Sequence, residues 1–92
     1  MEFEWNPRKA RGNLRKHRVT FHEAATVFGD SLSATVSDPE HSTEEARYIT
    51  IGRSDQGRLL MVAHAESRKR IRIISARTLT RSERKAYEET QE

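Results

Sequence analysis

The chain has 92 residues, of which 34% are hydrophobic and 34% charged, and its 17 Lys and Arg outnumber its 14 Asp and Glu. This length predicts one domain over residues 1–92 with a thin core, and the modest net charge of +3 argues against disorder. The absence of cysteine excludes disulfides, and the longest apolar run, residues 59–63, is too short to cross a bilayer. We therefore expect a soluble cytoplasmic protein that does not contact membranes.

Two helices are predicted in the first third of the chain. The first should begin near residue 7, because Asn6 can cap a helix and Pro7 suits its first position. The second follows Thr20, which forms a capping-box pattern with Glu23, so that each side chain should accept a hydrogen bond from the other residue's backbone N–H. Gly29 is expected to end this helix in the left-handed conformation.

Four strands and a third helix follow. Alternating or aliphatic runs joined by polar turns predict strands over about residues 31–36, 48–51, 58–64 and 70–75. A second capping-box pattern, Thr80 with Glu83, predicts a helix that ends near residue 89. Strands joined by short turns favour an antiparallel meander. The predicted fold is therefore α+β, with two N-terminal helices, a four-stranded antiparallel sheet and a C-terminal helix.

The last predicted strand alternates isoleucine with arginine. Alternation places Arg70 and Arg72 on one face, where their forked guanidinium groups suit a phosphodiester, although a merely solubilising row is the alternative. Arg77 has the parity of the isoleucines, so it can join Arg72 only if the strand ends or twists near Ser75. Both ends of the chain are basic and the middle is acidic, which indicates a nucleic-acid partner if the two ends meet in the fold.

His64 ends the third predicted strand and shares its face with Leu60 and Val62, so it is either a core residue or a proton-transfer group. Lys9 and Lys16 on the first helix are either a solvated face or a second wall of a phosphate site. The four histidines show no metal-ligand spacing, and no nucleotide or cofactor motif occurs, so we expect neither metal nor cofactor.

An ordered set of residues along nearly the whole chain resembles the BrnT family of bacterial type II toxins, whose fold resembles that of the RelE ribonuclease toxins. The set includes Phe3-Glu4-Trp5-Asn6, Lys9, Asn13, Lys16-His17, Glu23-Ala24, Asp38, His41-Ser42, Glu45, Arg47, Ser54, Gly57-Arg58, His64, Arg72-Ile73-Ile74-Ser75-Ala76-Arg77, Arg81, Glu83-Arg84 and Tyr87. Arg18 departs from the pattern, because the family usually has glycine at this position.

This resemblance implies an endoribonuclease that cleaves RNA, mRNA in particular, and inhibits translation. It also implies neutralisation by a BrnA-like ribbon-helix-helix antitoxin in a heterotetramer, with promoter DNA bound only through the antitoxin. Metal-free attack of a ribose 2′-hydroxyl needs a base, an acid and cations around the phosphate. We assign His64 as base or acid and Arg72 and Arg77 as phosphate stabilisers. The expected RNA contacts are Lys9, Lys16, Arg70, Arg81 and Tyr87, with Tyr87 as a reserve acid.

Two other functions fit the same composition. The chain could be a basic module that binds nucleic acid or a regulatory partner without catalysis. It could also be a structural subunit of a larger complex, which its thin core would suit.

Overall fold

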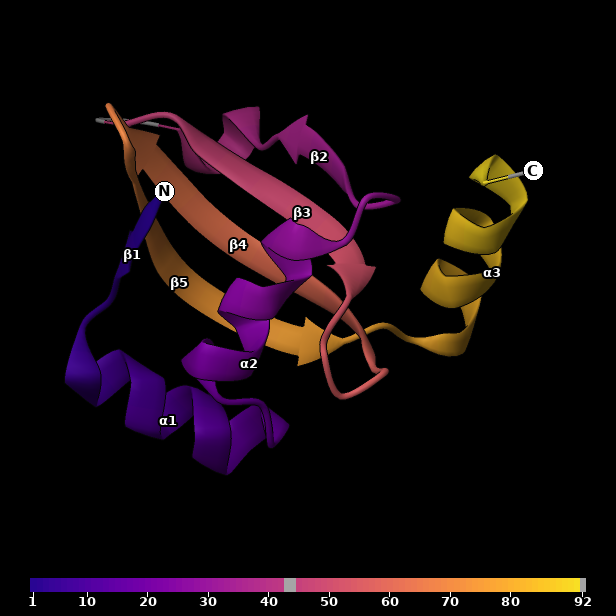
Figure 1. Ribbon diagram of the computed structural model, residues 1–92, viewed down its shortest axis with the longest axis horizontal. Helices are drawn as coiled ribbons and strands as arrows, with labels where there is room; N and C mark the ends of the chain where they lie inside the picture. The colour runs from indigo at the N-terminus through magenta and orange to yellow at the C-terminus, as the bar shows by residue number, and fades with distance from the viewer. Residues whose placement is uncertain (43–44, 92) are drawn as a thin grey trace.

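The structure is a computed structural model that describes residues 1–42 and 45–91 (Figure 1). The elements in chain order are β1 (Glu2–Glu4), α1 (Pro7–His17), α2 (Phe21–Thr26), the 3₁₀ turn η1 (Val27–Gly29), β2 (Ala34–Ser37), the 3₁₀ turn η2 (Pro39–His41), β3 (Arg47–Arg53), β4 (Leu59–Ser67), β5 (Arg70–Thr78) and α3 (Arg81–Thr90). The α+β class and the three predicted helices are confirmed.

The sheet has five strands in the order β1-β5-β4-β3-β2. Strands β2 to β5 pair antiparallel as predicted, but β1 adds to the edge of β5 in parallel, with Phe3 opposite Ile71. The predicted four-stranded antiparallel sheet is thus corrected to a five-stranded mixed sheet. The sequence prediction missed β1 because three residues are too few to show a period, and its partner lies more than sixty residues further along the chain.

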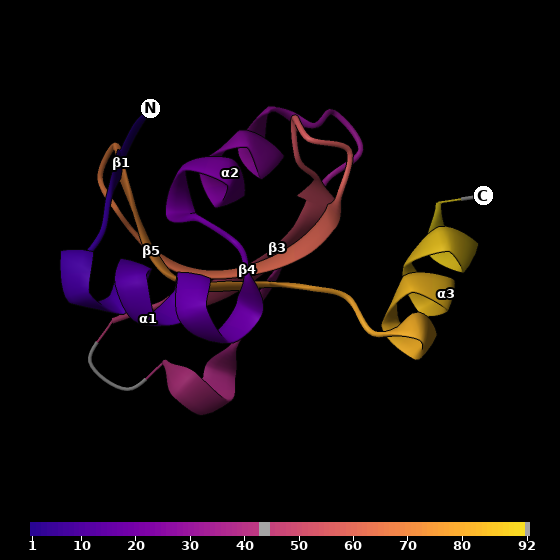
Figure 2. The same cartoon turned by 90° about the horizontal axis from the view of Figure 1, so that it is seen from below.

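One face of the sheet, the inner face, carries the core. Helix α2 covers this face, whereas η2, the magenta turn beside the grey trace, lies on the other side of the sheet (Figure 2). The buried core residues are Val19, Phe21, Ala24, Val27, Leu60, Val62, Ile71, Ile73 and Ala76. The opposite face, called the outer face below, carries the alternate residues of the same strands.

Helix α1 closes the part of the β5 edge that β1 leaves open. Buried Asn13 accepts a hydrogen bond from the Ala76 N–H (3.0 Å) and donates to the carbonyls of Ala76 (2.8 Å) and Val19 (3.0 Å). Its amide therefore pairs with the backbone of β5 as another strand would. This contact brings the two basic ends of the chain together.

Arg18 ends α1 in the left-handed conformation, with φ of 60°. It therefore adopts the backbone geometry that a glycine would adopt there without steric cost. Gly29 does not end its helix in this way, because α2 ends at Thr26 and continues as η1, and among the described residues Gly57 is the glycine with positive φ. The expectation for Gly29 is corrected accordingly.

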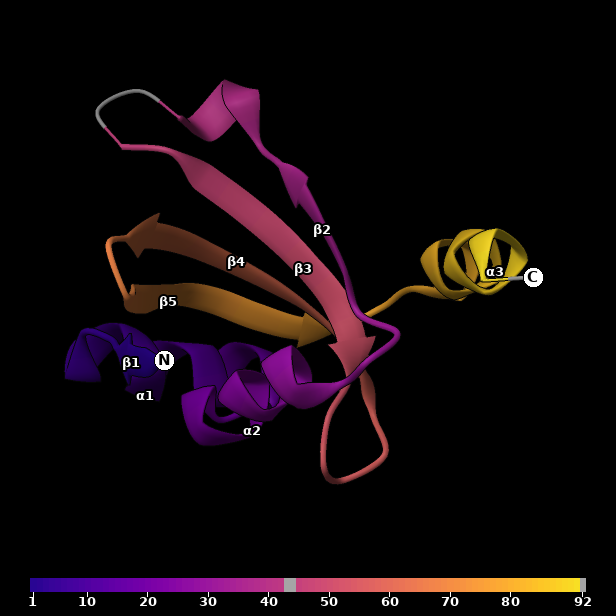
Figure 3. The same cartoon turned by 45° about the horizontal axis from the view of Figure 1, so that its top comes forward.

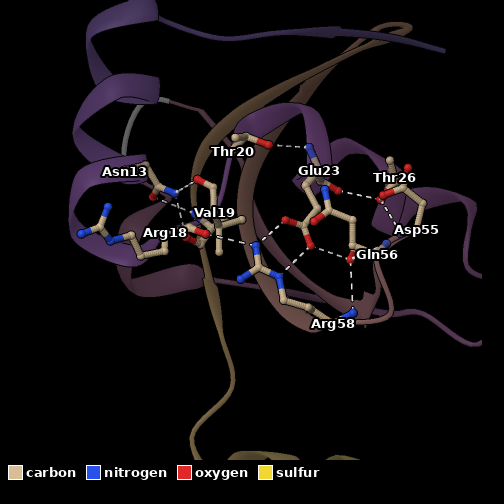
Figure 4. A network of polar contacts seen from close by, with 11 residues as sticks. Asn13, Arg18, Val19, Thr20, Glu23, Thr26, Asp55, Gln56 and Arg58 are labelled. Carbon is tan, nitrogen blue, oxygen red and sulfur yellow. Dashed lines mark hydrogen bonds and ion pairs between the residues drawn. The ribbon is translucent and has the colours of Figure 1, made fainter.

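The capping-box prediction is confirmed at one helix and half correct at the other. In α3, Thr80 and Glu83 each accept a hydrogen bond from the other residue's backbone N–H. In α2, Thr20 accepts from the Glu23 N–H, but the Glu23 carboxylate points instead to Arg58 and Ser54 (Figure 4). The competing partner is a guanidinium, which binds a carboxylate more strongly than a backbone N–H does.

Helix α3 stands apart from the layered body at one end of the sheet (Figure 3). None of its residues is buried, and it is held by the Glu83 ion pair with Arg77 and by the Tyr87 hydroxyl, which donates to the Leu32 carbonyl (2.7 Å). Within the described part of the chain, no helix is long and apolar enough to span a membrane.

Candidate functional site

The arginines of β5 lie on one face because the strand contains a bulge. Ile73 pairs with His64 and Ser75 pairs with Ala63, so Ile74 is an extra residue without a partner on β4. The bulge reverses the side-chain alternation beyond Ile74. Ala76 therefore joins the core, and Arg77 joins Arg70 and Arg72 on the outer face.

A fourth arginine, Arg47 on β3, lies on the same outer face as these three. Ala65 on β4 is flanked by Arg47 on β3 and by Arg72 on β5, and directly paired residues project from the same face. Arg47 is not among the predicted site residues, because its strand was expected to begin at residue 48, whereas β3 begins at Arg47. Its proximity to Arg72 depends on the register of three strands, which no local pattern reveals.

A cleft of about 250 Å³ opens on the outer face, lined by Glu4, Glu45, Ala65, Ser67, Arg70 and Arg72. The small side chains of Ala65 and Ser67 leave room in the cleft, and the arginines that line it supply forked hydrogen-bond donors. Its volume lies below the usual range for drug-sized ligands, which suits one phosphodiester and its sugars better than several nucleotides.

The three β5 arginines of this face each contact a carboxylate. Arg70 lies 3.6 Å from Glu4 and 3.9 Å from Glu2, and Arg72 contacts Glu45. These pairs are exposed, with 63% and 41% of the two arginine side chains accessible. An exposed pair contributes little to stability, so an incoming phosphate can replace the carboxylate at small cost.

Arg77 is held more firmly than the other two. Its Nη1 and Nη2 donate to the two carboxylate oxygens of Glu83 at 2.8 and 2.9 Å, and Nη2 also contacts the Met61 sulfur at 3.2 Å. The Arg77 guanidinium and the Thr80 N–H lower the pKa of Glu83 to about 2. Arg77 thus anchors α3 to the sheet as well as adding charge to the outer face.

The two predicted lysines adjoin this face from α1. Asn13 points at the β5 edge, and Ala10 packs against the core on one flank of the helix. With 100° per residue, Lys9 and Lys16 lie on the opposite flank, toward the outer face. Both are exposed, so the helix extends the positive surface along the edge of the sheet.

His64 is not beside the arginines. It is fully buried on the inner face, where it packs against Phe28 with ring centres 4.9 Å apart and its Nε2 hydrogen-bonds Thr50 Oγ1 at 2.7 Å. Its Nδ1 has no hydrogen-bond partner among the described residues. Burial lowers the pKa of His64, and nearby Glu66 partly opposes this shift.

The expected position of His64 beside Arg70 and Arg72 is therefore corrected, and the core alternative matches the structure. The parity that His64 shares with Leu60 and Val62 decides its position, since both of these residues are in the core. Adjacent strands bring residues close in the sheet, but the two faces of a sheet remain separate.

The two predicted residues of α3 lie beyond the end of the sheet. Arg81 is exposed at the first position of the helix. Tyr87 borders a separate cavity of about 370 Å³ with Asp30, Leu32 and Arg53, and burial raises the pKa of its hydroxyl. Tyr87 is not a lining residue of the outer-face cleft.

A small α+β domain with arginines around a cleft on one sheet face is suited to binding phosphodiesters. The model of the family described as the ribonuclease toxin, BrnT, of type II toxin-antitoxin systems matches residues 5–83. The chain therefore belongs to the BrnT family of ribonuclease toxins, and membership of a type II system implies an antitoxin partner.

The fold is similar to that of the Brucella abortus ribonuclease toxin BrnT, known from a crystal structure at 1.1 Å. The TM-score is 0.64 at 18% sequence identity, and the match covers 88% of this chain and 99% of that chain. At this identity the likeness concerns the fold. No curated protein matches the sequence.

Proposed function

We propose that this chain is an endoribonuclease that cleaves RNA at the outer-face cleft without a metal ion. The observation that carries the proposal is the gathering of Arg70, Arg72 and Arg77 on one face by the bulge at Ile74, with the cleft beside Arg72. Guanidinium groups remain protonated and bind the oxygens of a phosphodiester in pairs. They also stabilise the additional charge of the phosphorane transition state.

The proposed role of each residue follows from its position. Arg72 contacts the reacting phosphate, and Arg70 and Arg47 contribute charge from either side. Lys9, Lys16 and Arg81 guide the flanking RNA backbone by long-range attraction, which depends on salt concentration. Arg77 fixes α3 relative to the cleft through Glu83. His64 supports the sheet from its inner face, and we assign it no proton transfer.

In the cell, the proposed substrate is mRNA, and its cleavage inhibits translation. The proposed antidote is a BrnA-like ribbon-helix-helix antitoxin that forms a heterotetramer with the toxin and alone contacts promoter DNA. This part of the proposal rests on family membership. Inducible expression should stop growth, and co-expression of a BrnA-like antitoxin should restore it.

The proposal is tested with purified protein, RNA and a metal chelator. Wild-type protein should cut the RNA, and Arg72→Ala should reduce cleavage by about 100-fold or more, because one charge-stabilising group is lost. Arg15→Ala, on the solvent side of α1, is the matched control and should cut normally. Its side chain projects away from the β5 edge, since it lies 200° around the helix from Asn13.

Three outcomes separate the alternatives. RNA that remains intact but bound indicates a non-catalytic binding module. Cleavage that stops on chelation contradicts metal-independent chemistry. If Arg72→Ala cuts as fast as Arg15→Ala, the active site lies elsewhere on the molecule.

A further inference from the structure

Glu45 is the carboxylate that contacts Arg72 in the outer-face cleft. We propose that Glu45 is the catalytic base, which accepts the proton of the attacking 2′-hydroxyl. This inference rests on the proposed ribonuclease function. It assigns the proton transfer to a residue at the cleft, because His64 is buried and has no access to the substrate. About half of the Glu45 side chain, 45%, remains accessible, so a substrate can reach it.

The other carboxylates near arginines have structural partners. Glu83 caps α3 and clamps Arg77, and Glu23 is buried between Arg58 and Ser54. Glu4, in edge strand β1, is opposite Arg72 in the strand register and also lines the cleft, but its carboxylate contacts Arg70 (3.6 Å). Glu45 instead lies outside any strand, two residues before Arg47, and its carboxylate contacts the Arg72 guanidinium at the cleft. A base and a cation at one phosphate are what transesterification requires.

The connection that carries Glu45 is tied to the start of β3. The Asp38 N–H donates to the Arg47 carbonyl (2.8 Å), and the Arg47 N–H donates to Ser42 Oγ (2.9 Å). Ser42 in turn donates to the Asp38 carbonyl (2.7 Å). These bonds fix Ser42 and Arg47 on either side of Glu45. They act through backbone and hydroxyl groups, and the Glu45 carboxylate itself remains at the cleft.

In the proposed step, the Glu45 carboxylate takes the 2′-hydroxyl proton while the O2′–P bond forms, and Arg72 stabilises the negative phosphorane. The P–O5′ bond then breaks, and the departing 5′-oxygen takes a proton from solvent. Glu45 returns its proton to solvent. The products are a 2′,3′-cyclic phosphate and a 5′-hydroxyl, without redox change or co-reactant.

The test compares Glu45→Gln with Glu40→Gln. Glutamine keeps the shape of Glu45 but cannot accept the proton, so cleavage should fall by about 100-fold or more. Affinity for an uncleavable 2′-O-methyl RNA should stay within about threefold of wild type, so that kcat and not KM carries the loss. Glu45→Asp should restore part of the rate. Glu40, exposed in η2, is the matched control and should leave cleavage unchanged.

The outcomes are distinct. If wild-type protein leaves RNA intact, the proposed function fails and this inference fails with it. If wild-type protein cuts RNA and Glu45→Gln cuts within about threefold of it, the inference alone is overturned. Loss of RNA binding equal to the loss of cleavage also overturns it, since Glu45 would then only position Arg72. Thermal melting of both Glu45 variants checks folding, and a folded, active aspartate variant beside an inactive glutamine variant supports the base.

Discussion

The two faces of the sheet use charged residues in opposite ways. On the inner side, the Glu23 carboxylate is almost completely buried and meets Arg58 and Ser54, so its charge is compensated inside the protein. On the outer face, the pairs of Arg70 and Arg72 with glutamates are exposed. The inner polar groups therefore maintain the fold, whereas the outer arginines can exchange carboxylate for phosphate.

The largest expected loss of stability comes from the inner network. Glu23→Ala leaves Arg58 and Ser54 without their carboxylate and should lower the free energy of unfolding by about 3 kcal/mol, moderated because Arg58 reaches solvent. Urea denaturation measures the change. Glu40→Ala, an exposed glutamate of η2, is the control and should leave stability nearly unchanged. If Glu23→Ala were as stable as Glu40→Ala, the inner network would not be what maintains the fold.

The next largest effect is expected at Asn13. Asn13→Ala leaves the Ala76 N–H and carbonyl without their side-chain partner at the β5 edge and should cost about 2 kcal/mol. Hydrogen exchange at the Ala76 amide should accelerate in the folded protein. Arg11→Ala, on the solvent side of the same helix, is the control. If the Ala76 amide stayed protected from hydrogen exchange in Asn13→Ala, a group other than Asn13 would close the edge of β5.

A smaller effect is expected from pH. The pKa of His64 is lowered from 6.5 by burial, so below pH 6.5 the unfolded chain takes up a proton that the folded chain resists. Stability should be complete above about pH 6.5 and should decline as the pH falls below it. Below 4.5, Glu23 and Glu83 add to the loss, because their pKa values are also lowered in the folded protein.

Unfolding free energies at pH 7.5 and 5.5, values on either side of the ordinary histidine pKa of about 6.5, measure this decline. It should flatten in His64→Gln and persist in His41→Gln, since His41 is an exposed histidine outside the core. A decline that is unchanged in His64→Gln would contradict the assignment of His64 to the buried side.

The smallest effect is a gain at Arg18. Only its carbonyl joins the inner network, by accepting from Arg58 (3.1 Å), and its backbone is left-handed. Arg18→Gly should therefore raise stability by about 0.5 kcal/mol, the relief of backbone strain less the added flexibility of the unfolded chain. Arg15→Gly, inside the same helix, should lower stability by about 1 kcal/mol. If both glycine variants changed the free energy of unfolding in the same direction, the left-handed cap at Arg18 would be contradicted.

Local patterns predicted the elements, while the site depended on pairing. Thr80 with Glu83 and the alternation of arginine with isoleucine were readable from the sequence, because caps and strand parity involve neighbouring residues. The bulge at Ile74, the parallel strand β1 and the pairing of Arg47 with Ala65 could not be predicted from such patterns. They depend on register between distant segments, and a shift of one residue reverses the face of every side chain.

The central claim is that RNA binds at the outer face. The most direct measurement is the change in backbone amide NMR signals when the protein is titrated with uncleavable 2′-O-methyl RNA. The largest changes are expected at Glu45, Arg47, Ala65, Arg72 and Ser75, with the Tyr87 cavity and the solvent side of α1 around Arg11 and Arg15 little affected. Largest changes at either of those two places, with the outer face silent, would contradict it.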